Sequence, residues 1–197
     1  KIIKNKSNLH FLKSVNQALE FASKEFIALV NNDTILDRFI FSNAYKTLSK
    51  LSYDPIIGGM VMHLDGRIQD AGSIVFTDGS CLGLGRRATP NCSLYNFKRT
   101  VDYISGCFLF CKKNIFKKLN GFDTRFAPAY FEETDFCFRF SSNNGKIIYQ
   151  PECKLWHYEY GSDSANNTKN KLMQTNQKKF YDIHFKVIKN KLPRNYF

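Results

Sequence analysis

The sequence predicts an α/β fold in which a mixed β-sheet is flanked by helices. Short apolar runs that suit buried strands, at residues 26–30 and 56–62, alternate with segments whose apolar residues recur at helical spacing. This alternation of strand and helix is typical of an α/β sheet. The 197 residues, 43% of them hydrophobic and 15% aromatic, are enough for a domain with a sizeable core.

The first third of the chain predicts two helices and two strands. Leu12, Val15 and Leu19 share one helical face, and Asp54-Pro55 ends the second helix because the residue before a proline disfavours helical geometry. The predicted elements are, in order, a helix from about residue 7 to 22, a strand at 26–30, a loop at 31–34, a helix at 37–51 and a strand at 56–62.

The remainder of the chain is less regular at first. Residues 63–100 contain many Gly, Pro and Asp-Gly turn signals, and predict a hairpin and a long loop with one clear strand at 73–76. The later predicted elements are an ordered segment at 101–111, a short helix at 114–119 ended by Gly121, a helix at 132–144 ended by Gly145, a strand at 146–150 and a C-terminal amphipathic helix.

We predict a main domain over residues 1–165 and a basic helical tail over residues 166–197. The tail holds eight Lys or Arg residues against one Asp and supplies much of the formal charge of +12. It could bind an anionic membrane surface, nucleic acid or an anionic substrate, or it could be a solvated helix face.

The amino-terminal end lacks an expected element. A nucleotide-binding α/β domain normally begins with a strand whose carboxyl end helps to form the ligand crevice, whereas the first predicted element here is a helix. We therefore expect the chain to be truncated at its amino end.

Apolar stretches and cysteines indicate the compartment. The longest apolar runs, at 26–30 and 104–111, are shorter than the roughly 20 residues of a membrane-spanning helix, and no charged-then-apolar leader opens the chain. The six cysteines include no CxxC pair, and several lie in apolar runs. We expect a cytoplasmic protein with buried free thiols rather than disulfides.

Asp33 comes directly after the predicted strand at 26–30, in the sequence Asn31-Asn32-Asp33. We expect it at the carboxyl edge of the sheet, where ligands of α/β folds collect. Mg²⁺ and Mn²⁺ prefer oxygen ligands and typically use one or two protein carboxylates with phosphate oxygens and water. Asp33 is therefore a candidate metal ligand beside a diphosphate, although residues 31–34 also suit an ordinary turn and helix cap.

Three acids, Glu132, Glu133 and Asp135, lie within four residues at the start of a predicted helix. Acids in a first helical turn also stabilise a helix through its macrodipole, by about 0.3–1 kcal/mol each, without any catalytic role. Aromatic residues surround these acids on both sides, as expected for the lining of a pocket. The acid cluster is therefore a candidate for a catalytic base.

His157 stands beside a tryptophan, a setting in which a histidine is by default a packed or surface residue. A helix of about 13 residues from Glu132 spans roughly 20 Å, and a return strand of about six residues spans a similar distance. We therefore expect His157 at the edge that holds Glu133 and Asp33. A metal carboxylate, a base and an imidazole at one rim form a coherent site.

A series of ordered motifs carries a family resemblance. The motifs are Asn31-Asn32-Asp33-Thr34, Asp102-Tyr103-Ile104-Ser105-Gly106, Gly121-Phe122-Asp123, Phe131-Glu132-Glu133-Thr134-Asp135 and His157. Over nearly its whole length the chain resembles family 2 of the inverting glycosyltransferases, which have the GT-A fold, and especially rhamnosyltransferase-like bacterial members. The family's opening strand–helix–strand has no counterpart here.

The resemblance implies a role for each site residue. Asp33 would bind a divalent cation, Mg²⁺ or Mn²⁺, on the donor diphosphate, with His157 as the further metal ligand. Asn31 and Asn32 would lie beside the donor. Glu133 occupies the position of the catalytic base, where the family more often has Asp, and Glu132 is the fallback.

The implied reaction is transfer of a sugar from a nucleotide-sugar donor, of the dTDP-rhamnose or UDP-sugar type, to a hydroxyl of a surface-glycan or lipid-linked saccharide acceptor. The basic tail would suit peripheral contact with the inner face of the cell membrane. One alternative is an inactive remnant that binds a glycan or nucleotide. Nucleic-acid binding is disfavoured because the acid cluster does not suit it.

Overall fold

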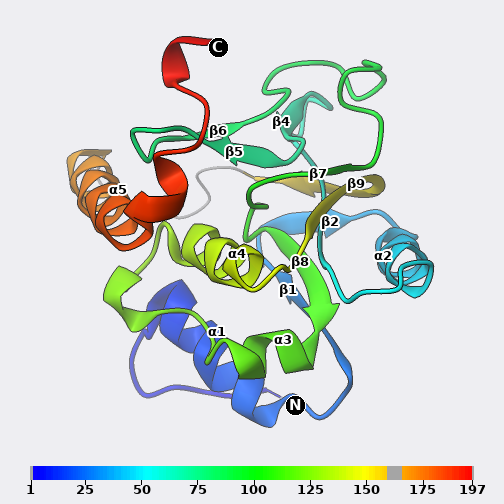
Figure 1. The fold of residues 1–197 in the computed structure, drawn as a ribbon. Helices are drawn as coiled ribbons and strands as arrows, with labels where there is room; N and C mark the ends of the chain where they lie inside the picture. Colours follow the sequence, from blue (N-terminus) through cyan, green and yellow to red (C-terminus); the bar gives the residue numbers. More distant parts are fainter. Residues whose placement is uncertain (1, 159–165, 197) are drawn as a thin grey trace.

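The computed structural model describes residues 2–158 and 166–196 and shows a central mixed β-sheet with helices on both faces (Figure 1). The helices are α1 (His10–Phe21), α2 (Ile40–Ser49), α3 (Lys113–Lys118), α4 (Glu132–Ser142) and α5 (Asn166–Ile188), with 3-10 turns at Thr124–Phe126 and Arg194–Tyr196. Helix α2 covers one face of the sheet, and α1, α3 and α4 cover the other, with α5 packed outside α4. The predicted α/β class is confirmed.

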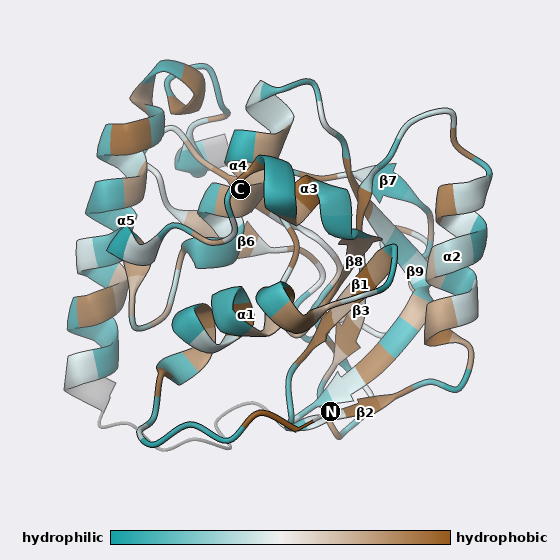
Figure 2. Cartoon of the chain, turned by 90° about the horizontal axis from the view of Figure 1, so that it is seen from below, coloured by the Kyte–Doolittle hydropathy of each residue, from teal (hydrophilic) through white to brown (hydrophobic). Residues whose placement is uncertain are grey.

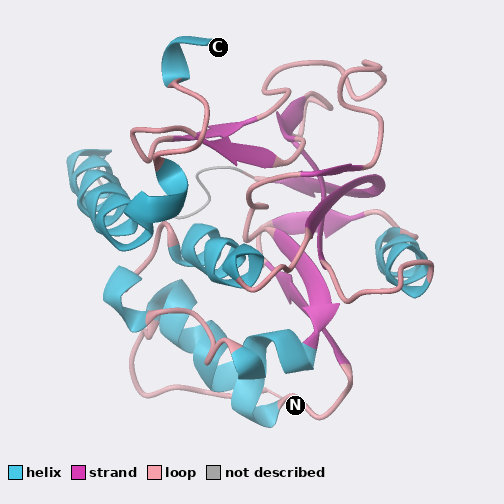
Figure 3. Ribbon diagram, viewed as in Figure 1, coloured by secondary structure: helices cyan, strands magenta, loops and turns pink. Residues whose placement is uncertain are grey.

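The main sheet, whose strands are drawn in magenta in Figure 3, has the strand order β1-β8-β3-β9-β2, with β4 beside β3 and β7 beside β9. The strands are β1 (Phe26–Val30), β2 (Thr34–Leu36), β3 (Ile56–Met62), β4 (Ile68–Asp70), β7 (Arg99–Thr100), β8 (Phe108–Lys112) and β9 (Ile147–His157), while β5 (Ser73–Val75) and β6 (Cys81–Gly83) form a separate hairpin. Strands β3 and β9 are parallel, and β8 runs antiparallel to both β1 and β3. The carboxyl ends of β1, β3 and β9 therefore lie toward one edge of the sheet.

The strand runs are apolar because both faces of the sheet are covered. All seven residues of β3 are buried. In Figure 2 the brown, hydrophobic colour is concentrated in the central strands β1, β3 and β8, whereas the helices also carry teal, hydrophilic segments. At Gly59 a Cβ atom would lie 2.1 Å from the carbonyl oxygen of Cys153, so only glycine permits this approach of β3 to β9.

All six cysteines are free thiols, as predicted, and four of them are buried.

Strand β2 was not predicted. Its three residues lie between the predicted loop at 31–34, which includes Thr34, and the predicted helix at 37–51, and α2 begins only at Ile40. Three residues are too few for a period-two pattern, and Thr34–Leu36 is a strand because it pairs with the end of β9.

The strand predicted at residues 146–150 is also longer than expected, because β9 continues to His157. Pro151 interrupts the pattern, and the register against β3 jumps from Gln150 to Lys154 between Gly59 and Met60. Such an irregularity bends a strand and increases its twist. The second half of β9 thereby reaches β2, where His157 pairs with Thr34.

A buried polar cluster joins α5 to α4. Asp135 is completely buried, and its two carboxylate oxygens accept a 2.7 Å bond from Arg139 Nε and contact His184 Nε2 at 2.8 Å. Phe180 of α5 packs edge-on against Phe138 of α4, with ring centroids 4.8 Å apart. Asp135 is a first-turn helix acid, as predicted, and it also anchors the C-terminal helix.

The turn that leads into α4 has an unusual backbone. Tyr130 and Phe131 both have positive φ, 75° and 71°, a conformation that bulky side chains rarely adopt. The fully buried Asn176 of α5 donates hydrogen bonds to the carbonyl oxygens of Phe126, Ala129 and Tyr130 at 2.9, 2.9 and 3.0 Å. Helix α5 therefore holds the backbone that presents the acid cluster.

Replacing Asn176 with alanine is expected to lower the free energy of unfolding by about 1–3 kcal/mol, because buried carbonyl groups lose their donor. Denaturant unfolding of N176A measures this loss. The matched control is N190A, whose amide is exposed just after α5. Equal stability of the two variants would contradict this role of Asn176.

Candidate active site

The structure brings Asp33 and His157 together. Asp33 Oδ1 lies 3.3 Å from His157 Nε2, and the backbone N–H of Tyr158 donates to the Asp33 carbonyl oxygen at 2.9 Å. The two side chains therefore occupy fixed positions on either side of the β2–β9 pairing. This distance agrees with the expectation that His157 lies beside Asp33, while the metal-binding role of the two residues stays a prediction.

The pair suits a divalent cation. Asp33 Oδ1 is buried and has no hydrogen-bond donor among the described residues. In octahedral Mg²⁺ coordination, with bonds of 2.0–2.1 Å, neighbouring ligand atoms lie about 3 Å apart, close to the observed separation. Within residues 2–158 and 166–196 no group of three or more His, Cys, Asp or Glu side chains could hold a metal by itself. A cation here would therefore need further ligands from a bound phosphate or water.

Asn31 and Asn32 lie in the turn between β1 and β2 but differ in setting. Asn31 is partly buried; its backbone N–H donates to the Cys107 carbonyl oxygen at 3.3 Å, and its side-chain amide lies 3.6 Å from the Cys107 sulfur. Asn32 is exposed. The structure therefore places Asn31 as a support of the turn, while Asn32 is open to a ligand.

The two glutamates of the acid cluster differ in access. Glu132 is 4% exposed, whereas Glu133 is partly exposed and lines a cavity of about 380 Å³. Each has one carboxylate oxygen, Oε2, that is buried without a hydrogen-bond partner within the described structure. Only Glu133 is therefore placed to meet a ligand in this cavity.

Their surroundings also shift their acidity. Burial, with the neighbouring Glu133 charge, raises the pKa of Glu132 from its ordinary 4.5 to about 9, so Glu132 is protonated at neutral pH. Burial and the charge of Asp70 raise the pKa of Glu133 as well, while the backbone amides of Glu133 itself, Gly106 and Thr134 oppose that rise. A raised carboxylate pKa is common for catalytic acids and bases.

Cys107 links the two parts of the site. The charges of Asp70, Glu133 and Asp33 all act on its thiol, adding to the burial that raises the Cys107 pKa to about 12. The acid cluster and the Asp33 turn therefore both lie near the segment at Gly106-Cys107. The Cys107 thiol is therefore protonated, and the side chain packs in the hydrophobic core.

Two site residues were missed from the sequence, Gln69 and Asp70 on β4. Gln69 Oε1 lies 3.0 Å from His157 Nδ1. Asp70 accepts a 2.6 Å hydrogen bond from Ser73 Oγ, and burial raises its pKa. They lie in the turn-rich segment 63–100, where no periodic pattern or motif distinguishes them from loop residues.

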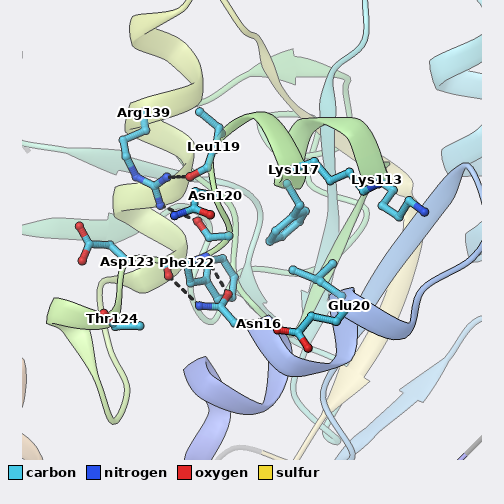
Figure 4. A pocket seen from close by; sticks show the side chains of 13 residues that line it. Asn16, Glu20, Lys113, Lys117, Leu119, Asn120, Phe122, Asp123, Thr124 and Arg139 are labelled. Atoms are coloured by element: carbon cyan, nitrogen blue, oxygen red, sulfur yellow. Dashed lines mark hydrogen bonds between the residues drawn. The ribbon is translucent and has the colours of Figure 1, made fainter.

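A second cavity, of about 760 Å³, lies elsewhere, between α1 and α3 (Figure 4). It contains none of the predicted site residues. Its amide and guanidinium groups hold the adjoining loop: Asn16 exchanges two 2.8 Å hydrogen bonds with Phe122, and Arg139 donates to the carbonyl oxygens of Leu119 and Gly121. These polar groups already have structural partners.

Comparison with known proteins agrees with this architecture. The sequence model for glycosyltransferase-like family 2 matches residues 4–177. The chain belongs to this family. A crystal structure of GalNAc-T7 with UDP, GalNAc and Mn²⁺ superposes with a TM-score of 0.65 at 10% identity, covering 100% of this chain and 45% of that one. The fold of this family 2 chain is therefore the GT-A fold.

A curated relative gives no functional detail. It is the uncharacterized protein y4gI of Sinorhizobium fredii (strain NBRC 101917 / NGR234), 24% identical over 161 residues, which are 79% of this chain and 18% of that protein. This family 2 chain thus spans under half of the solved structure and under a fifth of the curated relative.

No helix in the described ranges combines the length and the apolar character needed to cross a membrane.

The Glu132 environment predicts a pH-dependent stability. Because its folded pKa of about 9 exceeds the ordinary 4.5, the folded state holds this proton more tightly, and stability falls as pH rises between these values. E132Q removes this ionisation. At pH 8, E132Q is expected to exceed wild type in stability by at least about 1 kcal/mol, since one pKa unit corresponds to about 1.4 kcal/mol.

Thermal melting of both proteins at pH 5 and pH 8 provides the measurement. The gain should shrink toward pH 5, because the unfolded chain then also begins to hold the proton on Glu132. A difference between E132Q and wild type that does not change with pH would show that Glu132 is ionised in the folded protein.

Proposed function

We propose that this chain carries the catalytic site of a metal-dependent, inverting glycosyltransferase. The main support is that Asp33 Oδ1 and His157 Nε2 lie 3.3 Å apart. The aspartate oxygen is buried and has no hydrogen-bond donor among the described residues. Asp33 and His157 would hold Mg²⁺ or Mn²⁺ on the donor diphosphate. The cation would supply stabilisation of the negative charge that develops on the leaving nucleoside diphosphate.

Glu133 acts as the base. Its carboxylate lines the cavity beside α4, so an acceptor hydroxyl in that cavity can give it a proton while the oxygen attacks the anomeric carbon. The attack and the departure of the diphosphate occur on opposite sides of the anomeric carbon, which inverts it. The neighbouring Glu132 is protonated and buried, so it adds no second negative charge near the attacking oxygen.

The donor is proposed to be a nucleotide sugar, of the dTDP-rhamnose or UDP-sugar type. The structural neighbour was crystallised with UDP, GalNAc and Mn²⁺, which supports this class of ligand without naming the sugar used here. Asn32 is exposed in the turn that holds Asp33, and it would contact the donor, with Asn31 supporting the turn.

The acceptor is proposed to be a surface-glycan or lipid-linked saccharide that enters the cavity between α4, α5 and the β5–β6 hairpin. Beside Glu133 this cavity is lined by the aromatic rings of Tyr103 and Tyr130 and by the amides of Gln174 and Gln177. Apolar ring faces with a few polar groups are common in ligand pockets, and hydroxyl groups of a sugar could bond to the amides. Contact of the basic tail with an anionic membrane remains a prediction from charge.

Replacing Glu133 with glutamine is expected to lower kcat for transfer by about 10²–10⁴-fold, the usual contribution of a general base. The assay is sugar transfer by the full-length protein, with E152Q as a control for an exposed acid. E132Q should retain most activity. Near-normal transfer by E133Q, or a larger loss in E132Q, would remove Glu133 from this role.

The metal assignment has its own test. Chelation should abolish transfer, added Mn²⁺ or Mg²⁺ should restore it, and D33N should lose this response. Transfer that is insensitive to chelators would contradict the assignment. If the full-length protein, supplied with metal, binds the donor without transferring sugar, the alternative of an inactive remnant that binds a glycan or nucleotide is favoured instead.

The acceptor cavity predicts a selective kinetic change. Q174A is expected to raise KM for the saccharide acceptor about fivefold, the equivalent of one hydrogen bond of about 1 kcal/mol, with the donor hydrolysis rate unchanged. The control is T175A, which changes an exposed neighbour on α5 that does not line the cavity. An effect on donor KM instead would place Gln174 outside the acceptor site.

A further inference from the structure

Gln69 lies at an irregular position in the sheet. In the antiparallel pairing of β3 with β4, Val61 pairs with Asp70 but Met62 pairs with Ile68, so the ladder skips Gln69. An extra residue of this kind is a β-bulge, and bulges often re-aim a side chain next to an active site. The bulge frees Gln69 from the alternation that a regular strand would impose.

The released side chain reaches His157. Gln69 Oε1 lies 3.0 Å from His157 Nδ1, whereas Nε2 of the same ring faces Asp33 Oδ1 at 3.3 Å. A carbonyl oxygen can only accept a hydrogen bond, so the proton of this bond belongs to Nδ1. In the neutral imidazole the other nitrogen, Nε2, then carries the lone pair.

Two lone-pair atoms therefore converge at this point, His157 Nε2 and Asp33 Oδ1. The side chain of His157 is only 11% exposed, which limits the water available to the ring. Histidines that bind metals usually donate their other ring N–H to a carboxylate or carbonyl oxygen, which fixes the tautomer and the ring orientation. Gln69 supplies a carbonyl oxygen at that position.

We propose that Gln69 is the positioning residue of this site: it fixes the Nδ1–H tautomer of His157 and so presents the Nε2 lone pair beside Asp33. Gln69 contacts neither donor nor acceptor and acts only through His157. The tautomer assignment stands on the geometry alone. Its effect on cation affinity rests on the proposed function.

The tautomer is tested by ¹⁵N NMR of the His157 ring in the protein, at a pH where the ring is neutral. Wild type should show a protonated Nδ1 and an unprotonated Nε2. In Q69L the ring should become a mixture of tautomers. In Q69E a carboxylate oxygen can still accept the hydrogen bond, so the Nδ1–H form should persist. The control is Q17L, the same change at a partly exposed glutamine of α1.

A protonated Nε2 in wild type would overturn the proposal, because the Gln69 amide would then present its NH₂ group to the ring. An unchanged spectrum in Q69L would overturn it as well. If Q69E keeps the Nδ1–H tautomer, the change in Q69L comes from loss of the hydrogen-bond acceptor and not from a general disturbance of β4.

Affinity for Mn²⁺, measured by electron paramagnetic resonance in the presence of UDP, tests the consequence. Q69L should bind Mn²⁺ about 10–100-fold more weakly, the usual effect of losing such a partner, whereas Q69E and Q17L should bind as wild type does. If D33N and H157A lose Mn²⁺ but Q69L does not, the inference fails and the metal site stands. If D33N and H157A bind Mn²⁺ as tightly as wild type, the metal site fails, and the NMR result alone decides the role of Gln69.

Discussion

The pairing of the short strand β2 with the end of β9 joins two segments that are far apart in the sequence, and the candidate site is built on it. Thr34 lies opposite His157, and the N–H of Tyr158 bonds to the carbonyl oxygen of Asp33. These backbone bonds fix Asp33 and His157 before any ligand binds. A site held this way loses little conformational freedom on binding, since its ligating atoms are already close.

The second part of the site depends on α5. The acid cluster follows two residues with positive φ, Tyr130 and Phe131, and strained backbone of this kind persists only where the surroundings hold it. Asn176 and His184 of α5 supply that support, through the carbonyl groups of the turn and the buried carboxylate of Asp135. The C-terminal helix thus stabilises the position of Glu133 as well as lining the cavity beside it.

Much of the fold was predictable because its signals are local. The runs at β1 and β3 are continuously apolar, β3 because it is buried on both faces, and the acids at the start of α4 form a recognisable cluster. The residues that complete the site gave no such signal. Strand β2 exists through its distant partner β9, and Gln69 reaches His157 through a bulge whose register depends on β3. Asn176 likewise appears as one polar residue on an amphipathic helix until its three carbonyl partners are known.

The central claim is that Asp33 and His157 together form a metal site on the donor diphosphate. Crystals of the protein grown with UDP and Mn²⁺, measured at the manganese absorption edge, test this most directly. The account predicts one anomalous peak bonded to Asp33 Oδ1, His157 Nε2 and the oxygens of the diphosphate. A manganese ion bound to the diphosphate but contacting neither Asp33 nor His157 would contradict it.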